Sequence, residues 1–328
     1  MMNRLGLFLL VVISLLVVAC QQDSPAETTV NSTASAAVEV PRFDRDSAFA
    51  FVAAQVEFGP RVVNTAAHAN TKAYLVAQLQ RFGARVTEQD FIARAYTGED
   101  LEATNIIGRY RPDLRRRILL AAHWDSRHIA DSPLNTGDPA AAVVGADDGA
   151  SGVAVLLEIA RQLQAQSPEI GVDIVFFDAE DYGESNSPDS WGLGAQHFAR
   201  NFQGQRPIYG ILLDMVGAKK ARFPIEGYSR QFAPQVVNKV WRLAYQLGYG
   251  SYFVEENGSA ITDDHYFINT IANIPMIDII HRKTDTETGF GEHWHTDKDD
   301  LSIIDRRTLR AVGQTVLTLI YREAAGAI

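Results

Sequence analysis

The sequence predicts an α/β domain with a mixed, largely parallel central sheet flanked by helices. From residue 43 onward, stretches with helical spacing of apolar residues alternate with short apolar runs typical of buried strands. The composition, 46% hydrophobic and 21% charged, is that of an ordinary globular protein. Residues 41–328 contain no internal repeat and no second linker, so we expect one domain there.

Each expected element has a local signal. The runs 117–122 (RILLAA) and 172–177 (VDIVFF) are short and apolar, which favours buried strands. The helical pattern at 66–82 ends at Gly83, and glycine is common just beyond a helix C-terminus. The stretch 151–164 is strongly amphipathic. The other expected elements are helices at 46–58, 191–201, 235–247 and 305–324, and strands at 208–215 and 274–280.

Charge and cysteine content exclude some classes of protein. The formal net charge is −10, whereas a general nucleic-acid binder needs a basic surface, so we expect no nucleic-acid partner. Cys20 is the only cysteine of the chain. An intramolecular disulfide and a cysteine-rich zinc site are therefore both impossible.

The N-terminus resembles the export signal of a bacterial lipoprotein. In residues 1–19, Arg4 precedes an apolar run that ends just before Cys20, the position that is lipidated in such proteins. We therefore expect a signal peptide over 1–19 and anchoring to a membrane only through lipidated Cys20. Gln21 favours the outer membrane, facing the periplasm. An ordinary secretory signal with an incidental cysteine is the alternative. Residues 20–40 predict a flexible tether.

Polar residues follow the predicted strands at the point where each strand ends. In open α/β sheets, ligands bind beyond the carboxyl ends of the strands. Five separate segments deliver histidine or carboxylate side chains to that edge, and nitrogen and oxygen ligands without thiolates suit zinc or a similar divalent ion. These residues are His123 and Asp125, Asp147 and Asp148, Asp178, Glu180 and Asp181, Asp214, and His293 and His295.

Each of these residues also has a structural interpretation. Asp147 stands just before a predicted helix, where an aspartate commonly caps the N-terminus. A lone histidine is more often a packing residue than a ligand, and Glu180 with Asp181 could form a solvated turn. Five segments with the same chemistry at one edge of the sheet favour the metal-site hypothesis over these separate interpretations.

The ordered motifs resemble the zinc aminopeptidases of the M28 type, over about residues 105–321. The motifs Asp263-Asp264-His265 and Trp294-His295-Thr296 resemble those of glutaminyl cyclases, and residues 178–183 (DAEDYG) resemble the bacterial, lipoprotein-borne members. Those enzymes convert an N-terminal glutamine of a peptide or protein to pyroglutamate and release ammonia. The resemblance therefore implies a zinc-dependent glutaminyl-peptide cyclotransferase, an acyltransferase that acts on substrates with an N-terminal Gln.

The resemblance also assigns roles to individual residues. One zinc ion would be held by Asp148, Asp181 and His295. Glu180 would be the general acid and base, Asp214 and Asp264 would form a catalytic hydrogen-bond network, Trp294 would line the glutamine pocket, and His123 would lie beside the substrate. His123 and Asp214 match positions that hold a second zinc in the aminopeptidases.

Alternatives stay open at this point. A di-zinc aminopeptidase that hydrolyses N-terminal residues is possible, because all five potential ligands are present. A lipoprotein that kept the fold as a binding module is another alternative. The family often has Glu where this chain has Asp181, so Glu180 and Asp181 could exchange roles. Trp191 follows this acidic pair at a distance and receives no role.

Overall fold

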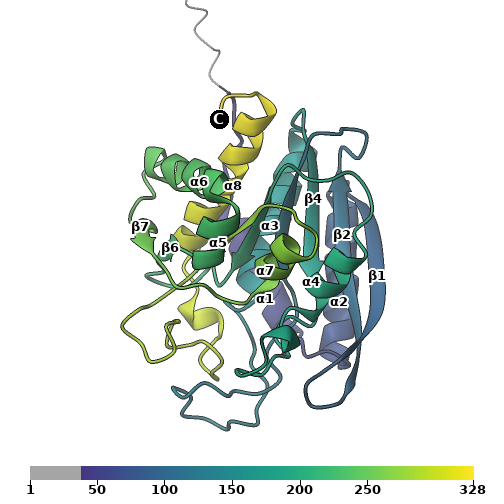
Figure 1. Cartoon of the computed structure of the whole chain (residues 1–328), viewed down its shortest axis with the longest axis vertical. Coiled ribbons are helices and arrows are strands. Elements are labelled where there is room, and N and C mark those ends of the chain that lie inside the picture. Colours follow the sequence, from purple (N-terminus) through teal and green to yellow (C-terminus); the bar gives the residue numbers. More distant parts are fainter. Residues whose placement is uncertain (1–37) are drawn as a thin grey trace, which may run out of the picture. The chain divides into compact units, whose positions relative to one another are not determined.

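The computed structural model describes residues 38–328 (Figure 1). The predicted signal peptide, the lipidation site Cys20 and most of the predicted tether lie outside the described residues. The α-helices are α1 (Arg45–Glu57), α2 (Ala66–Arg81), α3 (Ala150–Ala165), α4 (Leu193–Arg200), α5 (Gly227–Phe232), α6 (Pro234–Gln246), α7 (Asp264–Thr270) and α8 (Arg306–Ala324). The strands are β1 (Arg85–Arg94), β2 (Asp100–Tyr110), β3 (Arg117–His123), β4 (Gly171–Phe177), β5 (Gly210–Asp214), β6 (Phe223–Ile225), β7 (Phe253–Asn257) and β8 (Met276–Ile280). The short 3-10 helices are η1 (Pro188–Ser190) and η2 (Leu301–Ile303).

The central sheet is mixed and largely parallel, which confirms the predicted fold class. Its strand order is β1-β2-β4-β3-β5-β8, and β6 pairs with β7 in a separate two-stranded sheet. β4, β3, β5 and β8 run parallel to their neighbours, whereas β2 is antiparallel to β4 and β1 is antiparallel to β2. Every residue of β3 and β4 is buried, as their continuous apolar runs predict.

Helices cover both faces of this sheet. On one face, side chains of α1, α2, α3 and α8 form a large apolar core with the strands. On the other face, α4 and α7 pack over a smaller core. Figure 1 shows α4 and α7 in front of the sheet, with α1 and α3 behind it. The domain is therefore a three-layer arrangement in which each helical layer buries one side of the strands.

The hairpin of β1 and β2 was not among the predicted elements. Only Phe91 and Ala93 are buried in β1, because it is an edge strand whose other side chains are mostly polar and all exposed or half-buried. Such a strand lacks the continuous apolar run that marks β3 and β4. The short elements α5, α7, β6 and β7 were also missed, because they carry neither a long apolar run nor enough turns to show helical periodicity.

One close contact fixes how α3 sits on the sheet. A Cβ atom on Gly152 would lie 2.2 Å from the carbonyl oxygen of Leu213, so only glycine permits this approach of α3 to β5. The parallel strands β3, β4, β5 and β8 all end at the same edge of the sheet. The start of α3 is thereby held beside that edge, where the predicted site residues follow the strands.

Within residues 38–328, no helix combines the length and the apolar character needed to cross a bilayer.

Candidate active site

Three side chains from distant segments meet beyond the carboxyl ends of the strands. His295 Nε2 lies 3.1 Å from Asp181 Oδ1 and 3.8 Å from Asp148 Oδ2. One candidate ligand atom from each residue lies within 4.8 Å of the other two, and all three residues are buried. Asp181 follows β4, Asp148 precedes α3, and His295 lies between β8 and α8. The fold therefore brings together the three residues that the sequence analysis expects to hold zinc.

The donor set and its burial suit a divalent cation. Neither carboxylate oxygen of Asp181 accepts a hydrogen bond from the described residues, although both atoms are buried. A buried carboxylate without hydrogen bonds costs several kcal/mol unless a cation or a proton compensates it, and burial accordingly raises the pKa of Asp181. Two carboxylates and one imidazole are ligands that zinc accepts, and three protein ligands leave a position for substrate.

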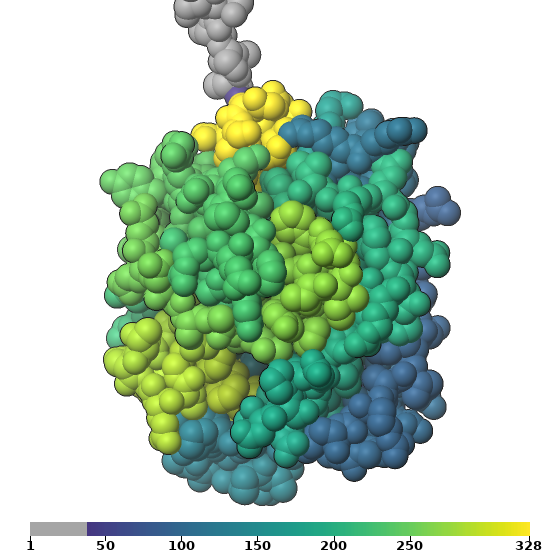
Figure 2. Space-filling view, in the orientation of Figure 1, coloured from purple at the N-terminus to yellow at the C-terminus, as the bar shows by residue number. Residues whose placement is uncertain are grey.

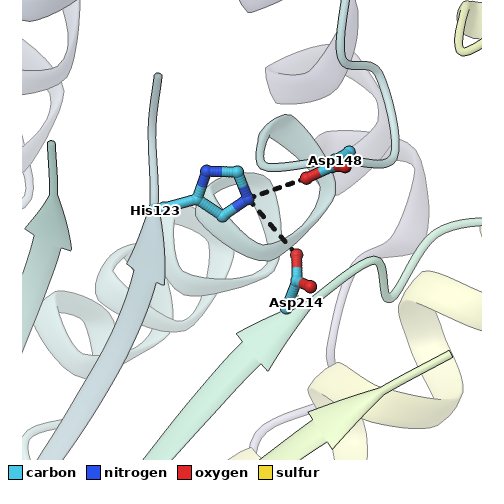
Figure 3. Close-up of side chains that lie close together, drawn as sticks. All are labelled: His123, Asp148 and Asp214. Carbon is cyan, nitrogen blue, oxygen red and sulfur yellow. Dashed lines mark hydrogen bonds and ion pairs between the residues drawn. The ribbon is translucent and has the colours of Figure 1, made fainter. Parts of the chain in front are cut away.

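A second cluster shares Asp148 with the first. His123 Nε2 lies 2.9 Å from Asp148 Oδ1 and 3.3 Å from Asp214 Oδ1. Figure 3 shows the imidazole, which extends from the end of β3, facing both carboxylates. The sequence resemblance assigns His123 and Asp214 to positions that hold a second zinc in the aminopeptidases. A distance of 2.9 Å is typical of a hydrogen bond, so in this geometry His123 links the two carboxylates directly.

Glu180 lies in an acidic and buried environment. Its side chain is 11% exposed, and its Oε2 is 4.0 Å from His123 Nδ1. Burial raises the pKa of Glu180 well above its usual value, and the carboxylates of Asp263 and Asp264 raise it further, against the opposing effect of His123. Such a carboxyl group can hold a proton near neutral pH, as a general acid and base must.

Asp214 and Asp264 occupy the same buried environment. Burial raises the pKa of Asp264 well above its usual value, and the neighbouring Asp263 raises it further. Burial also raises the pKa of Asp214. Both carboxyl oxygens of Asp264 are buried without a hydrogen-bond partner among the described residues. Asp264 is close enough to Glu180 to raise its pKa, but no hydrogen bond joins either aspartate to Glu180 in the described residues, so the predicted network stays a prediction.

Comparison with known proteins agrees with this geometry. Residues 105–320 match the family described as peptidase family M28. A glutaminyl cyclase of Bacteroides thetaiotaomicron, solved with N-acetylhistamine bound, is 50% identical, with a TM-score of 0.83 over 86% of this chain and 99% of its own. A glutaminyl cyclase of Tannerella forsythia is 49% identical over the same shares, also with a TM-score of 0.83. The chain belongs to the glutaminyl cyclases of peptidase family M28.

Other relatives of this cyclase-family chain include a described exopeptidase as well as a further cyclotransferase. A structure from Parabacteroides distasonis, described as a Zn-dependent exopeptidase, is 51% identical with a TM-score of 0.84 and covers 86% of this chain and 99% of its own. The glutaminyl-peptide cyclotransferase of Drosophila melanogaster is 28% identical over 276 residues, which are 76% of this chain and 73% of the fly protein. The zinc dependence of the family agrees with the candidate ligands.

Aromatic side chains lie beside His295, one of the candidate metal ligands of this M28 family member. The ring of Trp294 stacks on that of His295 at 3.7 Å between centroids, and Phe290 stacks on Trp294 at 4.6 Å. Trp191, which received no role from the sequence, lies 6.1 Å from the His295 ring and nearly parallel to it. A Cβ atom on Gly183 would lie 1.9 Å from the Trp191 ring, so glycine is required where the indole packs. Figure 2 shows a small hollow where green, teal-green and yellow-green stretches of the chain meet.

Buried polar groups that the sequence analysis did not assign hold the cluster in place. Asp125 is fully buried and accepts hydrogen bonds from the backbone N–H groups of Glu180 and Asp181, both at 3.1 Å. Asp299 accepts from the N–H groups of Asp147 and Asp148 at 2.7 and 3.0 Å. The sequence signal for Asp125 was the His123-x-Asp125 spacing. No local signal marked Asp299, because it lies about 150 residues from the loop that it orients.

Asp147 does not cap a helix. Gly149 occupies the N-cap position of α3, and no side chain caps that helix end. The Asp147 carboxylate instead accepts hydrogen bonds from the Gly217 N–H at 2.7 Å and contacts His293 Nε2 at 2.9 Å. Both partners lie close in sequence to candidate site residues, so Asp147 ties the loop of Asp148 to the segments that carry Asp214 and His295.

His295 is oriented by a carboxylate on its far side. Its Nδ1 lies 3.0 Å from Asp131 Oδ1, so Nδ1–H donates there while Nε2 faces the cluster. The guanidinium of Arg127 pairs with Asp131 and also donates to the carbonyl oxygens of Asp181 and Gly183 at 2.9 and 2.8 Å. The same guanidinium lies 4.9 Å from the Trp191 ring centroid. Arg127 therefore connects two of the three candidate ligands with the aromatic wall.

Proposed function

We propose that this protein is a glutaminyl-peptide cyclotransferase that converts the N-terminal Gln of peptides or proteins to pyroglutamate and releases ammonia. The observation that carries the proposal is the meeting of Asp148, Asp181 and His295 beside the buried acid Glu180, in a chain half identical to solved bacterial glutaminyl cyclases. Neither the cluster nor the similarity to solved cyclases is sufficient alone to assign the reaction. The fold also supports peptidases, and the metal cluster alone does not name a reaction.

Asp148, Asp181 and His295 would hold one zinc ion. When bound, zinc acts as a Lewis acid that polarises the γ-amide carbonyl of the glutamine side chain. The support for a single ion is the resemblance to glutaminyl cyclases, in which the positions of His123 and Asp214 resemble hydrogen-bonding groups without a second metal. Here His123 Nε2 lies within hydrogen-bond distance of Asp148 Oδ1, at 2.9 Å.

Glu180 would transfer the proton of the reaction. The substrate's α-amine attacks its own γ-amide carbon, forming the ring C–N bond, while the bond from that carbon to the amide nitrogen breaks. The carboxylate of Glu180 takes one proton from the amine and delivers it to the departing nitrogen, which leaves as ammonia. The burial and acidic neighbours that raise the pKa of Glu180 support both halves of this transfer.

The remaining residues would bind and confine the substrate. The indole of Trp294, stacked on His295, offers a flat wall for a glutamine side chain curled toward its own amine. Confinement of this kind removes much of the entropic barrier of an intramolecular attack. Asp264 and Asp214 would hydrogen-bond near Glu180 and the leaving group, and His123 would keep Asp214 in position from the neighbouring strand.

The assay measures two products from one Gln-initiated peptide. Release of ammonia with the peptide bond intact is expected, whereas release of free glutamine would identify an aminopeptidase and overturn the proposal. The aminopeptidase is the second candidate, and the cluster of His123, Asp148 and Asp214 favours it because these residues could hold a second ion. Metal analysis separates the two hypotheses again, since we expect one zinc per chain.

Glu180→Gln tests the assignment of the acid and base. We expect this variant to retain zinc and to lose turnover by about 10²–10⁴-fold, the usual contribution of general acid–base catalysis. Glu184→Gln, at an exposed position four residues along the chain, is the matched control and should remain active. Loss of zinc in Glu180→Gln with zinc retained in Asp181→Asn would show that the two acids have exchanged roles.

We also propose that the protein is an exported lipoprotein, anchored to the membrane through lipidated Cys20 after removal of residues 1–19. The support is the sequence alone, because Arg4 and the apolar run place the only cysteine at the expected position. Metabolic labelling with a fatty-acid analogue should label the wild-type chain and not Cys20→Ser. Labelling of both would exclude this anchor.

A further inference from the structure

A second feature of the structure is a basic cavity whose lining includes none of the residues that we place in the reaction, although His293 in its wall directly precedes Trp294 in the sequence. Its volume is about 780 Å³, within the range of small-molecule sites. The chain has only six lysines, and four of them line this one cavity, together with two arginines. The cationic lining residues, here called the basic cavity residues, are Lys219, Lys220, Arg222, Arg282, Lys283 and Lys298.

Most of these cations are not neutralised by the protein. Arg222 pairs with Glu256, and Lys283 pairs with Glu292, at 2.6 and 2.8 Å. Within the part of the chain that the structure describes, the other four make no ion pair. One further acid lines the cavity, so a formal excess of three positive charges remains with histidines neutral. In a chain with a net charge of −10, this concentration of positive charge is a local exception.

The wall of the cavity is held in place on one side by packing. The guanidinium of Arg282 lies 4.0 Å from the ring centroid of Phe290 and donates to Ser259 Oγ at 3.3 Å. His281 is buried, with Nδ1 3.0 Å from the backbone nitrogen of Arg222. Arg282 is therefore presented at a fixed position, while the exposed ammonium groups of Lys220 and Lys298 can adjust to a ligand.

We propose that this cavity binds a compact ligand with two or more phosphate groups. Lysine ammonium and arginine guanidinium groups are the usual partners of phosphate oxygens, and the charge excess matches a diphosphate. The concave shape favours a ligand that fits inside over an extended polyanion, which the acidic remainder of the protein would repel. The diphosphate could be free in solution or carried by a lipid headgroup.

The test is calorimetric titration of the full chain with inorganic pyrophosphate at about 0.15 M salt. We expect saturable binding of one pyrophosphate per chain, weakened at least tenfold in the double variant Lys220→Gln/Lys298→Gln. Lys72→Gln/Arg85→Gln, which also replaces two cations by glutamine, one on α2 and one on β1, is the control and should bind as the wild type does. Because both altered lysines are exposed, the double variant should keep its fold, which circular dichroism checks.

A vesicle experiment distinguishes the two sources of phosphate. Phosphatidylcholine vesicles with and without diacylglycerol pyrophosphate, a lipid that carries a diphosphate headgroup, are sedimented with the wild type and the double variant, and pyrophosphate is added as competitor. If the wild type binds the vesicles, the double variant does not, and pyrophosphate displaces the wild type, the ligand is a lipid headgroup. If the wild type binds pyrophosphate but not the vesicles, the ligand is a soluble diphosphate. Both support the proposal. The proposal would be overturned if the wild type did not bind pyrophosphate. It would also be overturned if the double variant bound pyrophosphate equally well, which is expected if pyrophosphate only coordinates a metal ion.

Discussion

Replacement of Asp131 by Asn tests whether the carboxylate behind His295 tunes the metal site. In the wild type, Asp131 Oδ1 lies 3.0 Å from His295 Nδ1, on the side of the ring opposite the candidate cluster. Asparagine keeps the size and an acceptor oxygen but removes the negative charge. We therefore expect the imidazole to stay in place and to become a weaker ligand.

The magnitude follows from the contact and its exposure. A hydrogen bond to a charged group contributes about 1.5–3 kcal/mol when it is buried. The Asp131 side chain is 33% exposed, so water screens part of the interaction, and a value of about 1.4 kcal/mol is reasonable. This corresponds to zinc binding about tenfold weaker, at the low end of the 10–100-fold losses known for such partners of metal-bound histidines.

Competition with a chelator of known affinity measures this change directly. Asp138→Asn, which alters an aspartate of the same loop that only accepts a local N–H hydrogen bond, is the control. A wild-type zinc affinity in Asp131→Asn would refute the reasoning.

Arg127→Gln should behave differently, since it leaves the carbonyl oxygens of Asp181 and Gly183 buried without their donor. We expect it to lower the free energy of unfolding by about 2–4 kcal/mol as well as zinc affinity.

Three further predictions concern other supports of the fold and site. Burial opposes ionisation of Glu226, but hydrogen bonds from His265 and Ser229 outweigh it and lower its pKa from 4.5 to about 2. Its contribution, about 3 kcal/mol, should be complete above pH 4.5 and lost as the pH falls toward 2, measured as the difference in unfolding free energy between wild type and Glu226→Gln. Asp299→Asn keeps one acceptor oxygen where two backbone N–H groups need two, so chelator competition should show zinc bound roughly tenfold more weakly; unchanged affinity would contradict this role. Gly183→Ala forces its Cβ into the indole that packs there, and urea unfolding should show a loss of about 1–3 kcal/mol.

The parts of the fold that sequence predicts are those with a repeated pattern. The buried strands β3 and β4 and the amphipathic helix α3 each carry an apolar run or periodicity over at least six residues, and all three were predicted. The edge strand β1 has too few apolar residues to mark it, and α7 is too short. The site residues could also be predicted from the sequence, because ligands in α/β sheets bind where the strands end.

The side chains that orient the candidate ligands could not be predicted from the sequence in this way. Asp131, Asp299 and Arg127 are polar residues in loops, and nothing local distinguishes them from solvated neighbours. Their roles depend on partners far along the chain, such as the pair of Asp131 and His295, which are 164 residues apart. The roles of Asp148, Asp181 and His295 as ligands remain predictions, but their meeting in space is a property of the fold.

Several residues of the site have strained backbone conformations, and polar groups hold two of them in place. Ala179, Met215 and His295 all have positive φ angles, of 52°, 46° and 55°, which non-glycine residues rarely adopt. Each conformation of this kind costs about 1–3 kcal/mol and persists only where its surroundings enforce it. Ala179 is held by its N–H hydrogen bond to Asp178, and His295 by its bond to Asp131. Ala179 adjoins Glu180, Met215 adjoins Asp214, and His295 is itself a candidate ligand, so the strained conformations occur where the side chains of the site must be held in position.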